Sequence, residues 1–141
     1  MRGQFSGISD RHQVSHLIRA TMEGVVFSLR HAAEAADRAG HQRNTQHLIG
    51  GGANSDLWAQ IVADVFGLGT ERILGSAPAH GSALLGGIGV GLLSWSDMRD
   101  LGLRPVDRFL PDPGRKSIYA EAYEVFRARS DEIDQQSRRP A

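Results

Sequence analysis

Cysteine is absent from the 141-residue chain, which excludes disulfide frameworks, thiol catalysis and zinc sites built on cysteine. Excess charge of either sign is also lacking, because 16 basic residues balance 16 acidic ones, so we expect neither a nucleic acid nor an anionic membrane as partner. The longest apolar stretch, residues 83–95, is shorter than the ~20 residues that span a bilayer, and it predicts a buried helix. No apolar segment opens the sequence as a signal peptide would, and with the lack of cysteine this leads us to expect a cytoplasmic location.

The length suits one domain, and the apolar periodicity predicts a long helix near its start. Between Asp10 and Ala39 apolar residues recur at steps of three and four, which is typical of a helix that packs one face on a core. Ser9 or Asp10 is suited to cap this helix, and Gly40 to end it. The residues predicted to face the core are Val14, Leu17, Ile18, Met22, Val25, Leu29, Ala32 and Ala36.

The middle of the chain alternates short strands with helices. Residues 46–49 predict a strand, Gly50 to Gly52 a turn, and Asn54 or Ser55 the start of an amphipathic helix that Gly67 ends. The elements predicted after it are a strand at 71–74, a small-residue helix at 79–93 and a helical turn at 96–101. Glycines weaken an isolated helix, so close packing must surround the helix at 79–93.

Prolines mark the last third of the chain. Pro105, Pro111 and Pro113 predict that residues 104–114 are extended or irregular. A final helix is predicted at 117–136, with Ile118, Tyr119, Ala122, Val125 and Phe126 facing inward. Helices between strands indicate an α/β fold with a parallel strand pair and a right-handed crossover. Because two strands are too few for a stable sheet, we expect further strands upstream.

The strand, glycine and helix sequence at residues 47–55 is the strongest local motif. Glycines let a ligand approach the backbone, and the free N–H groups and positive dipole at the start of a helix attract a phosphate. The alternative is an ordinary turn in which Asn54 or Ser55 only caps the helix. The motif is not a P-loop, because no Gly-Lys-Ser/Thr follows. A dinucleotide site stays open as a weaker alternative, since the third glycine is missing and Glu71 precedes the strand that it should follow.

Other candidate residues have ordinary structural explanations that we prefer. His12 and His16 have the spacing of zinc protease ligands, but Gln13 stands where the general-base glutamate would be, so helix-surface histidines explain them. Arg19 and Glu23 predict a solvated ion pair. Asp64 is interpreted as a solvated charge on the exposed edge of its helix, the alternative being a contact with a metal-bound phosphate. The aromatic residues of that helix, at positions 58 and 66, predict core packing.

Four segments together are typical of one family. They are residues 2–27, the string GGGANSDLWAQIVADVFG at 50–67, the small-residue stretch at 79–85, and the segment 109–123 with its Phe-x-Pro-Asp-Pro and Tyr-x-Glu-x-Tyr patterns. In this order they resemble the C-terminal domain of the FGGY carbohydrate kinases. The string at 50–67 resembles the family's adenosine-side signature and is the most specific match. The resemblance covers nearly the whole chain, and xylulose kinases and ribulokinases look nearest.

The resemblance implies a part of an actin-like, ribonuclease H-like ATPase domain without its opening antiparallel strands. In this family ATP with magnesium phosphorylates a hydroxyl of a sugar or polyol. By matching positions, Gly50, Gly51 and Gly52 would run beside the phosphates and ribose, and Asn54 and Ser55 near the adenine. The catalytic aspartate, the phosphate loops and the sugar pocket would lie upstream. Residues 1–141 would therefore be the C-terminal nucleotide-binding part, with no catalytic and no metal-binding residue, and inactive alone.

The expected partners are ATP or ADP, and a sugar only when the N-terminal domain is present. An incomplete sheet exposes an edge and apolar surface, so we also expect self-association or pairing with a complementary fragment. Three function classes follow from the same loop: a kinase segment, a non-enzymatic relative that serves in oligomer contacts or regulation, and a dinucleotide-binding module. Titration with ADP separates the first two, and a preference for NAD would identify the third.

Overall fold

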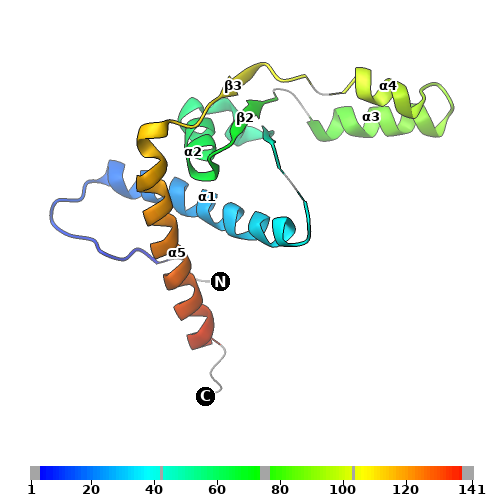
Figure 1. Ribbon diagram of the computed structural model, residues 1–141. Helices are drawn as coiled ribbons and strands as arrows, with labels where there is room; N and C mark the ends of the chain where they lie inside the picture. The colour runs from blue at the N-terminus through cyan, green and yellow to red at the C-terminus, as the bar shows by residue number, and fades with distance from the viewer. Residues whose placement is uncertain (1–3, 42, 74–76, 103, 138–141) are drawn as a thin grey trace.

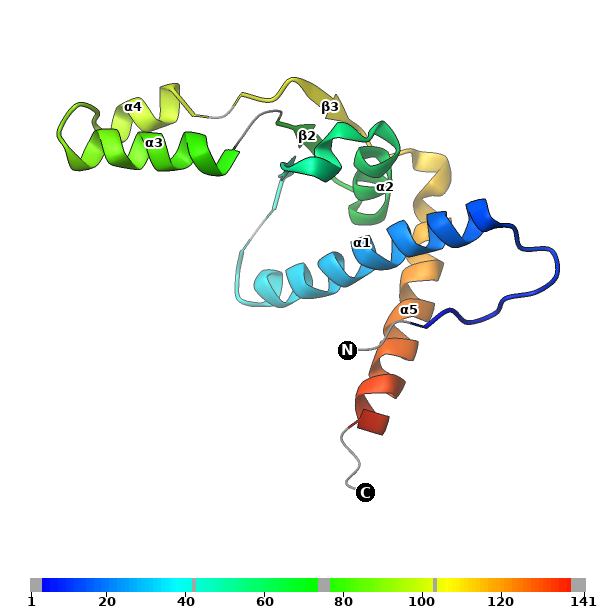
Figure 2. The same ribbon diagram turned by 180° about the vertical axis from the view of Figure 1, so that it is seen from behind.

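Three layers stack in the computed structural model, which describes residues 4–41, 43–73, 77–102 and 104–137. A small sheet forms the first layer and helix α2 (Asp56–Phe66) covers one of its faces. Helices α1 (Val14–Arg38) and α5 (Lys116–Ser137) cross each other beyond α2 (Figures 1 and 2). The α/β class and the partial character of the domain are as predicted.

The sheet contains strands β1 (Thr45–Leu48), β2 (Gly69–Arg72) and β3 (Asp107–Phe109) in that order. The predicted parallel pair is confirmed, with Leu48 opposite Arg72, although both strands begin earlier than expected and Leu74 lies outside the described residues. Strand β3 pairs antiparallel with β2 and was not predicted. Its sequence is short and lies between prolines, and only an edge position allows such a strand.

The core lies between α1, α2 and α5. Its buried residues are Val26, Phe27, Ile61, Val62, Val65, Tyr119 and Tyr123, with Trp58 and Phe66 packed against them. The Phe27 ring meets the rings of Tyr119, Tyr123 and Phe126 at centroid distances of 5.5–6.3 Å. The prediction for α5 is correct for Tyr119 but wrong for Ile118 and Val125, which are exposed. These two residues point away from the single face that α5 packs on α1 and α2.

Helix α1 starts at Val14, later than predicted, because Gln13 caps it. The Gln13 N–H donates to Nδ1 of His16 at 3.0 Å, and the Gln13 side chain accepts from the backbone of the same residue. His12 likewise accepts from the Ser9 N–H at 3.0 Å. Both histidines are exposed, as expected, and they serve as local caps. Gly40 follows the helix with φ of 93°, a conformation that favours glycine.

The apolar stripe of α1 departs most clearly from the sequence prediction. Val26 and Phe27 are buried, whereas Ile18 is 58% exposed, and the other large residues of the predicted stripe that are exposed are Val14, Val25 and Leu29. We call these four residues the α1 stripe. Their prediction as core is wrong within this chain, because α2 and α5 reach only one flank of α1 and no described element covers the other.

Helices α3 (Ala77–Gly89) and α4 (Trp95–Asp100) form a hairpin that projects beyond the three layers (Figures 1 and 2). The prediction of a buried helix here is wrong, since Leu85, Val90, Leu92 and Trp95 are all exposed. The turn of the hairpin packs on α3 at one point. Leu93 lies against Gly87, where an added Cβ would lie 2.7 Å from Cδ1 of Leu93. The expected close packing therefore exists at one glycine, while Gly81, Gly86 and Gly89 face open space.

Candidate nucleotide site

The glycine loop joins the carboxyl end of β1 to α2, as the sequence predicts. Gly50 has φ of 82° and ψ of −168°, a region that in practice only glycine occupies. Residues Gly51–Asn54 then form a single 3₁₀ turn. The N–H groups of Gly51 and Gly52 open this turn, so they have no partner in the preceding turn of a helix. These amides are the groups that a phosphate or ribose oxygen would meet.

Ser55 is the cap of α2, which decides between the two residues proposed from the sequence. Its hydroxyl oxygen accepts from the Trp58 N–H at 3.2 Å. Gly67 ends the helix with φ of 67°, also as predicted. Asn54 is exposed, and Asp56 places a carboxylate in the first turn of α2. That negative charge complements the helix dipole and disfavours a second anion at the same point.

The three glycines have different surroundings. An added Cβ at Gly52 would lie 3.1 Å from Nε1 of Trp58, so the indole packs against this backbone and a side chain would displace it. At Gly50 and Gly51 an added Cβ would meet nothing within 4 Å. Gly50 is required for its backbone conformation and Gly52 for packing. Gly51 has neither constraint within this chain.

A charged cluster underlies the loop. The Arg72 guanidinium donates to the Ala53 carbonyl at 3.3 Å, to the Asp56 carboxylate at 2.5 Å, and to Asp107 on β3. It also stacks over the Phe109 ring, with Cζ 5.1 Å from the centroid. Hydrogen bonds to Asp107 and then Asp56 raise the pKa of Arg72, which therefore stays charged. Sequence analysis did not single out Arg72, because its partners lie 16 and 35 positions away.

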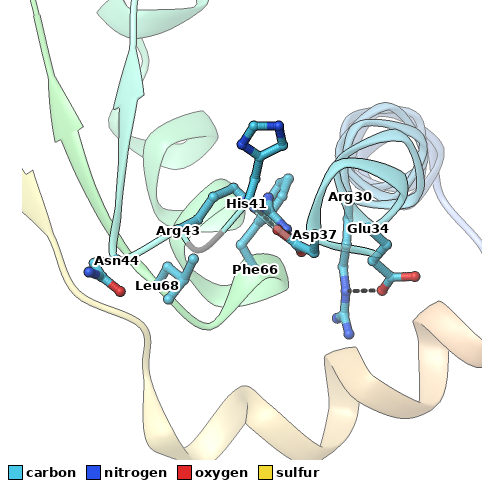
Figure 3. Close-up of a pocket in the computed structure, with 8 residues that line it drawn as sticks. All are labelled: Arg30, Glu34, Asp37, His41, Arg43, Asn44, Phe66 and Leu68. Atoms are coloured by element: carbon cyan, nitrogen blue, oxygen red, sulfur yellow. Dashed lines mark hydrogen bonds and ion pairs between the residues drawn. The ribbon is translucent and has the colours of Figure 1, made fainter. Parts of the chain in front are cut away.

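Two cavities lie elsewhere in the described part of the chain, and the loop residues 50–55 line neither. The larger, of about 500 Å³, lies between the end of α1 and the end of α2 (Figure 3). Its arginines are engaged within the chain, since Arg30 pairs with Glu34 and donates to the Val65 carbonyl, and Arg43 pairs with Asp37. The smaller, of about 310 Å³, runs between Leu29 of the α1 stripe and strand β1.

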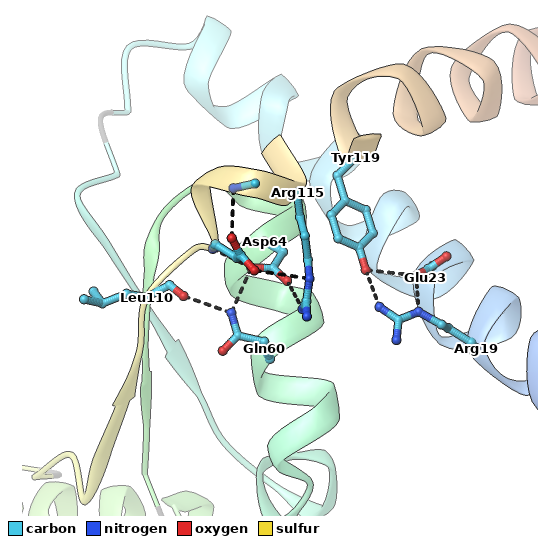
Figure 4. A network of polar contacts seen from close by, with 9 residues as sticks. Arg19, Glu23, Gln60, Asp64, Leu110, Arg115 and Tyr119 are labelled. Atoms are coloured by element: carbon cyan, nitrogen blue, oxygen red, sulfur yellow. Dashed lines mark hydrogen bonds and ion pairs between the residues drawn. The ribbon is translucent and has the colours of Figure 1, made fainter. Parts of the chain in front are cut away.

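Asp64 is buried, so its prediction as a solvated helix charge is wrong (Figure 4). Its carboxylate accepts from the Asp112 N–H at 2.8 Å, from Nε2 of Gln60 at 2.8 Å and from Arg115 at 3.0 Å. The network fastens the turn before α5 to α2. The four-residue spacing of Gln60 and Asp64 is a weak sequence signal for their hydrogen bond. No sequence pattern indicates the other two partners, Asp112 and Arg115, which lie 48 and 51 residues away.

Arg19 and Glu23 pair at 2.8 Å as predicted, yet not as an isolated solvated pair. The Tyr119 hydroxyl accepts from Arg19 and donates to Oε1 of Glu23, each at 2.9 Å (Figure 4). Burial raises the pKa of Tyr119, so the hydroxyl keeps the proton that it donates. The three residues join α1 to α5 rather than forming a reaction centre.

Within the described residues there is no group of three or more histidine, aspartate or glutamate side chains placed to hold a metal ion. The same part of the chain contains no helix of the length and apolarity that crossing a membrane demands.

Comparison with known proteins finds one family whose members resemble most of this chain. The model of the FGGY family of carbohydrate kinases, C-terminal domain, matches residues 1–90. A xylulose kinase of Staphylococcus epidermidis is 34% identical over 130 residues, which is 91% of this chain and 26% of that protein. The crystal structure of a xylulose kinase from Rhodospirillum rubrum is similar with a TM-score of 0.81 at 31% identity, covering 99% of this chain and 29% of that one. A ligand-bound xylulose kinase from Lactobacillus acidophilus shares the fold, with a TM-score of 0.84 at 20% identity.

Proposed function

Because the chain belongs to the FGGY family of carbohydrate kinases, we propose that it forms the ATP-binding part of an enzyme that transfers the γ-phosphate of ATP to a sugar or polyol hydroxyl. The single observation that carries the nucleotide role is the exposed glycine loop, where Gly51 has no conformational or packing need to be glycine. A backbone that lacks Cβ atoms and has N–H groups without partners allows a ribose or phosphate to approach closely.

The charges around the loop suggest how the nucleotide lies. The exposed Asp56 carboxylate at the start of α2 disfavours a phosphate there, so we place the adenine near Asn54 and Ser55 and the phosphates beside residues 50–52. Magnesium neutralises phosphate charge in transfer reactions of this kind when it is bound. The described residues provide no metal cluster, and we assign no magnesium ligand to this chain.

The chain spans about a quarter of the length of the curated relatives that it matches. Phosphoryl transfer also needs a base for the acceptor hydroxyl and in-line positioning of that hydroxyl. We assign neither role to a residue of this chain, and we expect the purified chain to show no sugar-dependent ATP turnover. ATP turnover that rises with xylulose concentration would contradict this expectation. The cytoplasmic location expected from the sequence stays a prediction.

The partner that we propose is the remainder of an FGGY kinase chain, docked on the α1 stripe and the free edge of β1. Strand β1 lies at the edge of the sheet, and the cavity of about 310 Å³ separates it from Leu29. An added strand would find unpaired backbone groups on one side and Leu29 of the α1 stripe beside it. Exposed apolar residues gathered on one helix face mark such a contact.

This contact is testable by co-expression with the Rhodospirillum rubrum xylulose kinase shortened by the region that matches this chain. We expect the two polypeptides to copurify, and Val25→Glu with Leu29→Glu to abolish copurification. Ala35→Glu, at an exposed position of α1 outside the stripe, is the matched control. A stable dimer of this chain alone that the stripe variants disrupt would assign the surface to a second copy instead.

The nucleotide role is tested by calorimetric titration of ADP into the chain and its Gly51→Ala variant. The added methyl meets no protein atom, so we expect the melting temperature to be unchanged and ADP binding to be lost. Gly24→Ala, also in open space but in the middle of α1, should keep ADP binding. Equal ADP affinity of the chain and Gly51→Ala would refute the placement of the nucleotide.

A second candidate is a non-catalytic module that contributes only contacts to an assembly. The observation that favours it is that neither cavity includes the glycine loop, so the loop is exposed at the tip of β1. Failure of ADP to bind, both alone and in the copurified complex, would support this function. Preference for NAD over ADP in the same titration would instead support the dinucleotide module.

A further inference from the structure

Arg72 occupies the last position of the middle strand, directly opposite the residue that leads into the glycine loop. Leu48 pairs with Arg72 across the parallel strands, and Asp107 pairs with it across the antiparallel ones. The side chain points to the α2 side of the sheet, where only 13% of it is exposed. Strand order therefore brings a partly buried arginine side chain under the glycine loop.

The guanidinium joins three segments that are distant in sequence. It reaches the Ala53 carbonyl inside the loop, Asp56 at the start of α2, and Asp107 on β3. Phe109 covers its flat face. Arginine presents its donors in a rigid fork, so contacts on several sides fix the positions of all the groups that it touches.

The loop needs such a support. Ordering a residue costs about 1–2 kcal/mol of backbone entropy, and glycine has the most freedom to lose. Three consecutive glycines would otherwise spread over many conformations, and a ligand would have to order them on binding. A fixed anchor at Ala53 reduces that cost before the ligand arrives.

We propose that Arg72 is a positioning residue, which holds the glycine loop in its binding conformation while Asp107 holds Arg72. The proposal rests on the nucleotide role of the loop. Arg72 does not act as a phosphate ligand in this arrangement, because two carboxylates already share its single charge. Strand β3 thereby contributes to a nucleotide site that it does not touch.

Trp58 provides a direct report on the loop, because its indole packs against Gly52. The chain has two tryptophans, and Trp95 lies exposed on the α3–α4 hairpin, so Trp95→Phe leaves Trp58 as the only tryptophan, which is excited selectively over the two tyrosines. In this background we expect Arg72→Gln to increase iodide quenching of Trp58 and to raise the Kd for ADP about tenfold. Asp107→Asn should produce smaller changes in the same directions.

Arg43→Gln is the matched control. Arg43 also pairs with an aspartate, Asp37, and stacks over an aromatic ring, that of Phe66 at 5.3 Å, but it precedes β1 at the opposite end of the strand. We expect Arg43→Gln to lower the melting temperature without altering Trp58 quenching or ADP affinity. If Arg72→Gln behaves in the same way as Arg43→Gln, Arg72 only stabilises the fold and the proposal is wrong.

The two proposals can fail separately. If ADP binds neither to the unaltered chain nor to the copurified complex, the nucleotide role fails, and Trp58 quenching still decides whether Arg72 orders the loop. If Arg72→Gln does not fold, Asp107→Asn decides, because it removes the carboxylate that holds Arg72 while leaving the arginine itself in place. Unchanged quenching in a folded Asp107→Asn variant would then overturn the proposal.

Discussion

Replacing Asp64 by alanine removes a buried carboxylate that three donors share. The Asp112 N–H, the Gln60 amide and the Arg115 guanidinium lie 2.8–3.0 Å from its oxygens. The carboxylate itself has no exposed surface, whereas the Arg115 side chain is 45% exposed. The variant therefore leaves an arginine that water can reach and a backbone N–H that lies partly buried.

The size of the effect follows from these exposures. A hydrogen bond to a charged group contributes about 1.5–3 kcal/mol, but the three bonds are not additive, because water can solvate Arg115 and Gln60 in the variant. We expect Asp64→Ala to lower the free energy of unfolding by about 3 kcal/mol, a large part of the ~5–15 kcal/mol of a typical domain. Asp64→Asn keeps one acceptor for the Asp112 N–H and should lose less.

Urea unfolding followed by circular dichroism measures this difference. Asp37→Ala is the control, because Asp37 also pairs with an arginine but on the surface, where ion pairs contribute little. A midpoint shift for Asp64→Ala no larger than that for Asp37→Ala would show that the network does not fasten α5 to α2. The inference that burial of the Asp64 carboxylate makes its hydrogen bonds strongly stabilising would then be wrong.

The remaining predictions concern helix ends and one buried tyrosine. Ser55→Ala removes the cap of α2 and should cost about 1 kcal/mol, and Ser55→Asp should restore it, both measured by urea unfolding. Gly67→Ala places a side chain at φ of 67° and should lower stability by about 1 kcal/mol; no loss would show that the helix end relaxes. Burial, followed by the nearby Glu34, raises the pKa of Tyr123 from 10.0 to about 12, and its hydroxyl has no hydrogen-bond partner. The raised pKa means that the folded state holds the phenol proton more tightly than the unfolded state. This contribution to the free energy of unfolding should therefore be fully present below pH 10 and should decline as pH rises toward 12. Tyr123→Phe should not show this decline, and its free energy of unfolding at pH 7 should match or exceed that of the unaltered chain.

Much of the candidate site could be predicted because its signals are local. A helix cap, a glycine with positive φ and an amphipathic stripe depend on neighbours within a few residues. The loop at Gly50, the cap at Ser55 and the end at Gly67 are accordingly where the sequence predicts them. The parallel pairing of β1 and β2 followed from the helix between them.

Asp64 and Arg72 could not be assigned in the same way. Each side chain finds its main partners on β3 or on the turn before α5, which the prolines had marked only as irregular. The α1 stripe shows the opposite case, in which a correct helix and a correct apolar pattern meet no partner within the described residues. Periodicity indicates which face of a helix avoids water, but not which element covers that face.

The sequence by itself determined the local elements, the glycine loop and the family, because these depend on short patterns and on the order of segments. Only the tertiary structure decided which charges are buried, that a third strand supports the loop, and that one flank of α1 stays open. The physical reason is that burial and the polar networks depend on contacts across 16 to 100 residues of sequence, and such contacts exist only once the layers have packed.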